Sequence, residues 1–369
     1  LAAVRDLARR HPLLRVRAVD TPGGPRLVDA GDDMQAQLVD LTAHTPDEAA
    51  QIARGIRQGV GRPADPYAVT AGRAVLLAES DGAHRLLLSM SHVLFDGWSV
   101  DALRAELIDL LYRGGAGAPA PDGAALDAYL DAMDDWVSWR GADAAVLAHA
   151  RAFHDAERAA QSRVGHLVRP GRVAVAGATI PKAAGGTEAG MVAAMALAAR
   201  RVFGLEQVPI ARAQHGRRLG TRSFFDVVGN TADLVPLVLP PGEPAATVEA
   251  AARALVAGQI DQFHWLAYLR RYDPVLLRDW PRPAHPLAAT LRLGYTQNNP
   301  VADESVTLLD GETQSAPSRD GSLEVQVGAG GSGLACAVTG WGLPERTVSH
   351  YAVALAGALA ELAEDGGRP

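Results

Sequence analysis

The sequence has one cysteine and no long apolar run, and these two absences exclude several classes of protein. Cys336 alone cannot form an internal disulfide or a cysteine-based zinc site. It lies in the apolar run Leu334–Val338, so we expect a small buried side chain rather than a nucleophile, in a reduced cytoplasmic setting. No apolar run approaches the roughly 20 residues of a membrane span, and Leu1–Arg17 does not resemble a signal peptide.

An excess of basic residues is also missing. The net charge is -7, so we expect neither nucleic acid nor an anionic membrane surface as a partner. The 11 histidines show no metal-ligand spacing, and we expect no metal site. With 369 residues, 48% of them hydrophobic, the chain is long enough for two globular domains.

Helical and strand patterns alternate along the chain, which predicts an α/β fold. Residues 46–58 have helical apolar spacing, with Thr45 as the N-cap. Residues 72–78 and 85–90 have the pattern of strands, joined by a turn. A Gly/Pro-punctuated stretch places the division between two halves, residues 1–165 and 166–369. We also expect helices at 1–11, 100–112, 126–160, 188–203, 247–268 and 348–362, and strands at 13–19, 208–213, 235–241, 291–296, 323–328 and 333–339.

The stretch Leu86–Val100 carries the chemistry that the sequence suggests. A buried strand is followed by His92, Asp96 and Gly97 in the spacing His-x-x-x-Asp-Gly. A histidine acts as a base when one tautomer is held in place, and a glycine permits close approach of a ligand to the backbone. A histidine beside a core strand can equally serve packing alone, and the residues by themselves leave both readings open.

Ser91-His-Val-Leu-Phe-Asp-Gly-Trp-Ser99 resembles the His-His-x-x-x-Asp-Gly-Trp-Ser core of the condensation domains of nonribosomal peptide synthetases. Ser91 replaces the family's first histidine. The resemblance continues in order along nearly the whole chain, although the family's strand before the first helix is lacking. The other segments that carry it are His11–Arg15, Tyr129–Arg140, Gly186-Thr187, Gly216-Arg217, Val228–Leu237 and Tyr295–Asn298.

This resemblance implies two α/β sandwich halves of the chloramphenicol-acetyltransferase type, arranged as a V around a central tunnel. Donor and acceptor carrier proteins, or neighbouring synthetase domains, would deliver acyl groups tethered to phosphopantetheine. The reaction would join an acyl or aminoacyl thioester to an acceptor amine or hydroxyl, in the biosynthesis of a natural product such as an antibiotic. The chain would bind no cofactor of its own and would be a cytoplasmic monomer.

The resemblance also assigns roles to residues of the motif. His92 would take a proton from the attacking amine or position it, and Gly97 would leave room for the thioester. Asp96 would form an ion pair with Arg217 and so hold the loop that carries His92. Apart from the resemblance, we expect Trp98 to pack against that loop rather than to contact the substrate. Independently of the resemblance, we expect Ser99 to cap the helix that starts at Val100.

Two residues depart from the family pattern. Ser91 leaves His92 to act alone, and it is also compatible with a condensation-like domain that has lost activity. Asp233 stands where the family usually has asparagine. It could alter the contact between the halves, read a cationic substrate group, or be a solvated loop residue. The resemblance places Asp233, Tyr295 and Gln297 along the substrate channel.

Three functions therefore follow from the sequence. The first is a condensation-type acyltransferase. The second is an inactive condensation-like module that binds carrier proteins or recruits another enzyme. The third is a freestanding acyltransferase with a soluble acceptor.

Overall fold

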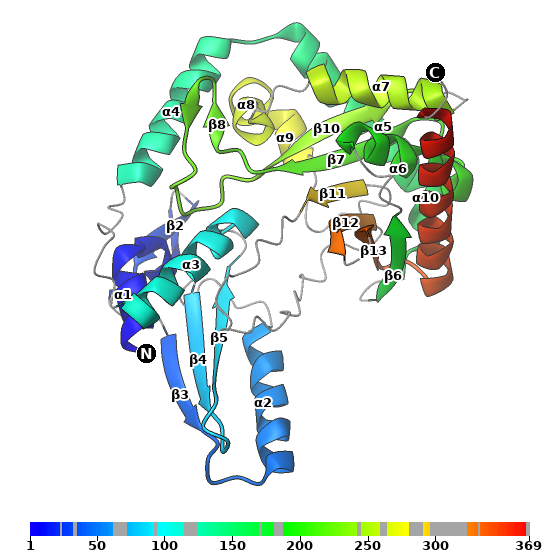
Figure 1. Cartoon of the computed structure of the whole chain (residues 1–369). Coiled ribbons are helices and arrows are strands. Elements are labelled where there is room, and N and C mark those ends of the chain that lie inside the picture. The colour runs from blue at the N-terminus through cyan, green and yellow to red at the C-terminus, as the bar shows by residue number, and fades with distance from the viewer. Residues whose placement is uncertain are drawn as a thin grey trace. The chain divides into compact units, whose positions relative to one another are not determined.

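The computed structural model describes residues 1–22, 24–31, 35–61, 72–91, 94–113, 124–169, 172–180, 187–241, 245–258, 264–279, 291–295, 323–330 and 333–366. It has two compact units (Figure 1). Of the described residues, the first unit holds Leu1–Ala132 together with Ser223–Thr231, a stretch that we call the crossover segment. The rest of the described chain forms the second unit.

The first unit is built on a three-stranded sheet of order β3-β4-β5. Strand β4 (Gly72–Ala78) pairs in parallel with β3 (Gln35–Asp40) and antiparallel with β5 (His84–Met90). Because side chains alternate across a strand, Ala74 faces α1 (Ala2–Arg10) and α3 (Gly97–Arg113), whereas Val75 and Leu77 face α2 (Pro46–Gly61). The sheet is therefore covered by helices on both faces (Figure 1).

The remaining elements of this unit connect these layers. The 3-10 turn η1 (Pro12–Arg15) leads from α1 into a hairpin of β1 (Val16–Thr21) and β2 (Gly24–Asp29). Thr45 caps the start of α2, as the sequence predicted, since its Oγ1 accepts from the backbone N–H of Glu48 at 3.5 Å. Glu48 completes a capping box, because Thr45 Oγ1 and N each donate to Glu48 Oε2, at 2.8 and 3.0 Å.

The second unit contains a six-stranded sheet of order β10-β7-β11-β12-β13-β6. Strand β11 is parallel to β7 and β12, and the other neighbours are antiparallel. The strands are β6 (Val173–Ile180), β7 (Val208–Gln214), β10 (Asp233–Leu239), β11 (Leu291–Tyr295), β12 (Leu323–Gly330) and β13 (Gly333–Trp341). A small pair, β8 (Arg218–Leu219) and β9 (Arg222–Ser223), leads to the crossover segment.

Helix α6 (Glu188–Phe203) lies at the centre of the second unit's core. Its side chains from Ala189 to Ala199 are all buried, as expected for a helix that is apolar all round. Cys336 is buried in the same core, and burial raises the pKa of its thiol to about 11, as befits a packing residue rather than a nucleophile. The other helical elements are α5 (Ala144–Val164), η2 (Gly165–Leu167), α7 (Ala245–Gly258), α8 (Trp265–Tyr272), α9 (Pro274–Asp279) and α10 (Glu345–Gly366).

Two expectations about the middle of the chain were wrong. The single helix expected over residues 126–160 is two helices, because α4 (Ala124–Arg140) ends before Gly141, which has a φ of 66°, and Asp143 caps the start of α5. The division between the units falls after Ala132 rather than after residue 165. The reason is that Phe153 and its neighbours on α5 pack into the core of the second unit.

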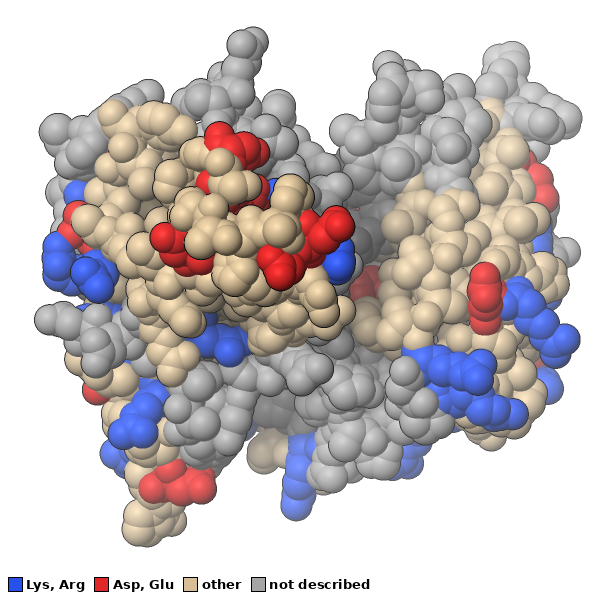
Figure 2. Space-filling view, turned by 90° about the horizontal axis from the view of Figure 1, so that it is seen from below, with Lys and Arg blue, Asp and Glu red and all other residues tan. Residues whose placement is uncertain are grey.

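The distribution of charge on the described surface agrees with a sequence that has no excess of basic residues. On the face drawn in Figure 2, the described Arg side chains lie in small groups, interspersed with acidic groups. None of the helices in the described part of the chain has the length and hydropathy that a bilayer crossing requires.

Candidate functional site around the Asp-Gly motif

The loop between β5 and α3 is held at both ends. At its start, the carbonyl of Ser91 accepts hydrogen bonds from the backbone N–H groups of Leu94 and Phe95, at 2.9 and 3.1 Å. At its end, the ring of Phe95 is buried among residues of α1 and α3. Ser91 contributes to this turn through its backbone, which any residue could supply, so serine in place of the family's first histidine is compatible with it. His92 lies outside the described residues.

Asp96 is the N-cap of α3. Its Oδ1 accepts a hydrogen bond from the backbone N–H of Ser99 at 2.9 Å, and its carbonyl accepts one from Val100 at 3.1 Å. The helix therefore begins at Gly97, and the expectation that Ser99 caps it was wrong. An aspartate here is favoured twice, because it satisfies an otherwise unpaired N–H group and places negative charge at the helix N-terminus.

The other carboxylate oxygen of Asp96 binds the crossover segment. Oδ2 accepts hydrogen bonds from the backbone N–H of Thr231 at 3.1 Å and from its hydroxyl at 3.2 Å. Asp96 and Thr231 are both almost completely buried. A buried carboxylate must be matched by donors, and the crossover segment supplies two of them.

Ser99 and Trp98 extend this contact. The hydroxyl of Ser99 accepts a hydrogen bond from the N–H of Gly229 at 2.9 Å, and its own proton can serve either the carbonyl of Gly229 at 2.7 Å or Asp96 Oδ1 at 2.8 Å. Trp98 donates from Nε1 to the carbonyl of Phe225 at 3.1 Å, and the two rings lie 5.1 Å apart. Trp98 thus packs against the crossover segment, a contact that the sequence did not suggest.

Gly97 has space around it. A Cβ atom built on Gly97 would meet no described atom within 4 Å, and its backbone does not require glycine, since its φ is not positive. The described structure therefore gives no packing reason for glycine here. This absence is consistent with a role in leaving room for a ligand.

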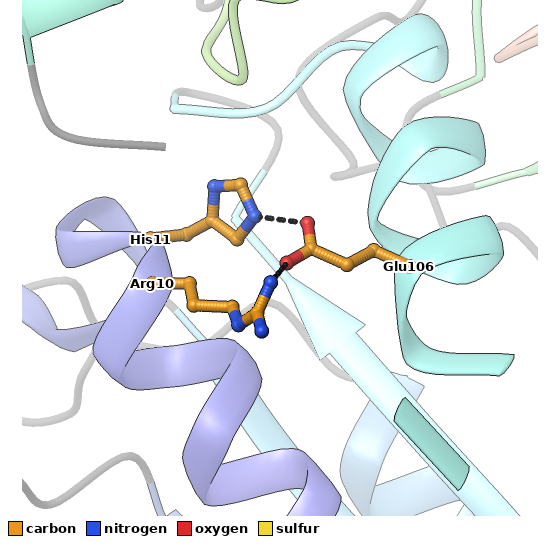
Figure 3. A network of polar contacts seen from close by, with 3 residues as sticks. All are labelled: Arg10, His11 and Glu106. Carbon is orange, nitrogen blue, oxygen red and sulfur yellow. Dashed lines mark hydrogen bonds and ion pairs between the residues drawn. The ribbon is translucent and has the colours of Figure 1, made fainter. Parts of the chain in front are cut away.

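Helix α3 is anchored a second time, near its middle. Glu106 Oε2 lies 2.6 Å from Nε2 of His11, and Glu106 Oε1 lies 3.2 Å from Nη1 of Arg10 (Figure 3). His11 is buried and forms the C-cap of α1. This network joins α1 to α3. We did not predict it from the sequence, although the Arg-His pair at the end of α1 and the acidic residue on α3 could have indicated an ion pair between the two helices.

Arg217 is completely buried in the second unit. Its Nη1 donates to the carbonyl of His215 at 3.2 Å, and its backbone N–H donates to Nδ1 of the same histidine at 2.9 Å. The ion pair between Asp96 and Arg217 stays a prediction.

Asp233 has a structural role that the sequence did not suggest. It is the first residue of β10, its side chain is closed to solvent, and its Oδ2 accepts a hydrogen bond from the backbone N–H of Trp265 at the start of α8. Oδ1 accepts from Leu234 at 2.8 Å, and Nδ1 of His264 lies 3.5 Å from Oδ2. The solvated-loop alternative was therefore wrong.

The environment of Asp233 changes its acidity. Burial raises the pKa of this carboxyl above its ordinary value of 3.8, and the nearby His264 and the backbone donors oppose the rise. A place in the substrate channel stays a prediction for Asp233. It also stays a prediction for Tyr295, whose backbone ends β11, and for Gln297, which lies outside the described residues.

Comparison with known proteins agrees with the predicted family resemblance and with the fold. A condensation domain family model matches residues 2–147. Phosphinothricin tripeptide synthetase PhsC of Streptomyces viridochromogenes is 32% identical over 125 residues, which cover 32% of this chain and 11% of PhsC. The chain spans about a tenth or less of the length of the first curated relatives that it matches.

Solved structures extend the likeness over the full length. The epimerization domain from the third module of tyrocidine synthetase B matches with a TM-score of 0.71 and 16% identity, over 98% of this chain and 88% of that chain. A structure on condensation domain-mediated chain release from the enacyloxin polyketide synthase matches with a TM-score of 0.64 and 18% identity, over 100% and 76% of the two chains. The predicted α/β fold of the chloramphenicol-acetyltransferase type is confirmed, while the V-shaped arrangement with its tunnel stays a prediction.

Proposed function

We propose that this condensation-domain-like chain is an acyltransferase that joins a carrier-bound acyl or aminoacyl thioester to an acceptor amine in nonribosomal peptide synthesis. The observation that carries the proposal is the anchored loop of the motif. Its two ends are fixed by the turn at Ser91 and by the buried Asp96, and Gly97 next to it has open space. Proton transfer requires a positioned side chain, and the fixed ends of this loop support that role for His92.

The reaction needs no covalent enzyme intermediate, because the donor is already activated as a thioester. The acceptor nitrogen attacks the thioester carbonyl, a C–N bond forms and the C–S bond breaks. The proton lost by the amine ends on the phosphopantetheine sulfur, and His92 either transfers it or orients the attacking nitrogen. Holding both reactants in the correct geometry lowers the barrier further.

The partners follow from this chemistry. A donor carrier protein presents the thioester, and a second carrier protein, or a neighbouring synthetase domain, presents the acceptor. Phosphopantetheine belongs to the carriers, so the chain itself needs no cofactor.

A reconstitution tests the proposal. The chain is incubated with a donor carrier loaded with an aminoacyl-phosphopantetheine and with an aminoacyl-loaded acceptor carrier, and intact-protein mass spectrometry follows both. We expect the acceptor to gain the mass of the donor acyl group only when the chain is present. If no product forms across a panel of donors while both carriers still bind, the chain is a carrier-binding module and the proposal is wrong.

A further inference from the structure

We propose that the crossover segment holds the reactive loop in place and that Thr231 is a positioning residue for the reaction, an inference that rests on the proposed function. Thr231 is 1% exposed and lies in the crossover segment, which follows the second unit's Arg222 and precedes its Ala232. It contacts Asp96, a residue of the motif itself.

The hydrogen bonds divide the Asp96 carboxylate between two tasks. Oδ1 caps α3 through Ser99, and Oδ2 is left for Thr231. The helix therefore contributes donors to one oxygen, and the crossover segment contributes donors to the other. Both donors of Thr231 act on a buried charge, where a hydrogen bond contributes more than in water.

Further contacts beside Asp96–Thr231 make the docking extended rather than local. Gly229 exchanges hydrogen bonds with Ser99, and Phe225 receives both the indole N–H and the ring of Trp98. Asp96, which precedes Gly97, and Trp98 and Ser99, which follow it, are thus all bound by one nine-residue segment. Motion of that segment is transmitted to the N-terminus of α3.

The chain connects this anchor directly to the reactive histidine. His92 precedes Asp96 by four residues, and Phe95 between them is fixed in the core. A shift of Asp96 therefore displaces one end of the loop that carries His92. A displacement on the order of 1 Å is enough to lower a rate by about 100-fold when it misaligns the reacting groups.

The segment is also tied to the second unit by its sequence. Thr231 and Asp233 are separated by one residue, and they anchor different structures: Thr231 binds the motif, and Asp233 binds the start of α8. The same short stretch of chain thus supplies one anchoring residue to each unit.

The test compares Thr231→Val, Thr231→Ser and Thr42→Val in the full chain. Valine keeps the shape and the backbone N–H of Thr231 but removes the hydroxyl, and serine retains it. Thr42 is a matched control, because its N–H and hydroxyl also bind one carboxylate, that of Asp40, at 2.9 and 2.6 Å, but in an exposed position. Single-turnover rates and KM for the loaded donor carrier are measured under conditions where each variant is folded.

We expect Thr231→Val to lower the single-turnover rate by at least about tenfold with KM changed by less than about threefold. Thr231→Ser should recover most of the rate, and Thr42→Val should match the wild type. A full rate for Thr231→Val, or no recovery with serine, would overturn the inference.

Hydrogen exchange gives a readout that does not depend on turnover. Backbone amides of residues 91–100 should exchange at least about tenfold faster in Thr231→Val than in the wild type. In Thr42→Val, these amides should exchange at the wild-type rate. If the wild type forms no product but this exchange still rises, the proposed function fails and the anchoring of the loop stands. Unchanged exchange in this stretch would contradict the anchoring, whatever the activity.

Discussion

Asp96 and Thr231 lie 135 positions apart in the sequence, and Oδ2 of Asp96 accepts hydrogen bonds from both the backbone N–H and the hydroxyl of Thr231. The other oxygen, Oδ1, caps α3. The aspartate of the His-x-x-x-Asp-Gly motif is therefore an anchor in the described structure. It joins the helix that follows the reactive loop to a segment from the far half of the sequence.

Asp96→Asn should destabilise the protein by about 2 kcal/mol, because an amide has only one acceptor oxygen. Whichever way the amide is turned, its NH2 group faces a donor, either the N–H of Ser99 or that of Thr231. Chemical unfolding measures the change. Asp40→Asn is the matched control, since Thr42 binds Asp40 Oδ1 alone and that oxygen is retained in asparagine. Equal stability of Asp96→Asn and the wild type would contradict the anchoring role.

Gly97→Ala should separate activity from stability. The added methyl group meets no described atom within 4 Å, and alanine suits a helix, so we expect a change in the unfolding free energy of less than about 0.5 kcal/mol. If the thioester uses this space, the single-turnover rate should fall at least about tenfold. Gly55→Ala in α2, where the space is also open, is the control and should leave the rate unchanged. An unaltered rate in Gly97→Ala would remove this glycine from the site.

Glu106→Gln tests the second anchor of α3. The substitution keeps the shape of the side chain but removes the charge that faces His11 and Arg10. Because this network is largely buried, we expect a loss of about 1 to 2 kcal/mol in unfolding free energy. Asp6→Asn, which breaks an exposed pair with Arg9 on α1, should change stability by less than about 0.5 kcal/mol. Similar losses in both variants would show that the network adds little.

Asp233→Asn should change how stability depends on pH. The pKa of Asp233 is raised in the folded chain, so the folded state holds this proton more tightly than the unfolded state does. The stabilising contribution of the protonated carboxyl is complete below pH 3.8 and is lost as the pH rises through the folded-state pKa. The unfolding free energy of Asp233→Asn relative to the wild type should therefore increase as the pH rises from 3.8 through the folded-state pKa of Asp233.

Asp273 provides a control of opposite sign. The backbone N–H of Leu276 and the guanidinium of Arg151 lower the pKa of Asp273. Its contribution is therefore present above the unfolded-state pKa and is lost as the pH falls. The deficit of Asp273→Asn relative to the wild type should shrink toward acidic pH. If the unfolding free energies of the wild type and Asp233→Asn change in parallel with pH, burial does not raise the pKa of Asp233 and the prediction is wrong.

The sequence predicts those features that depend on local pattern. The strands β4 and β5, their connecting turn and the N-cap at Thr45 all follow from neighbouring residues. The break between α4 and α5 does not, because the apolar spacing continues across Gly141. Asp96 could have been recognised as the cap if the helix had been started at Gly97 rather than at Val100.

Contacts between distant segments have no local signature. The pairing of Asp96 with Thr231 and of Ser99 with Gly229 joins residues 130 or more positions apart. The burial of Asp233 depends on the start of α8, 32 positions further on. No periodicity or spacing encodes such contacts, so the anchor of the motif became visible only in the folded chain.

The single-turnover rate of His92→Ala is the most direct test of the account. The reaction uses a loaded donor carrier at saturation and an acceptor carrier in excess, and chemical unfolding is measured on the same preparations. We expect the rate of His92→Ala to fall by at least about 100-fold, with an unfolding free energy within about 0.5 kcal/mol of the wild type. A wild-type rate in this variant would contradict the assignment of His92 as the residue that serves the attacking amine.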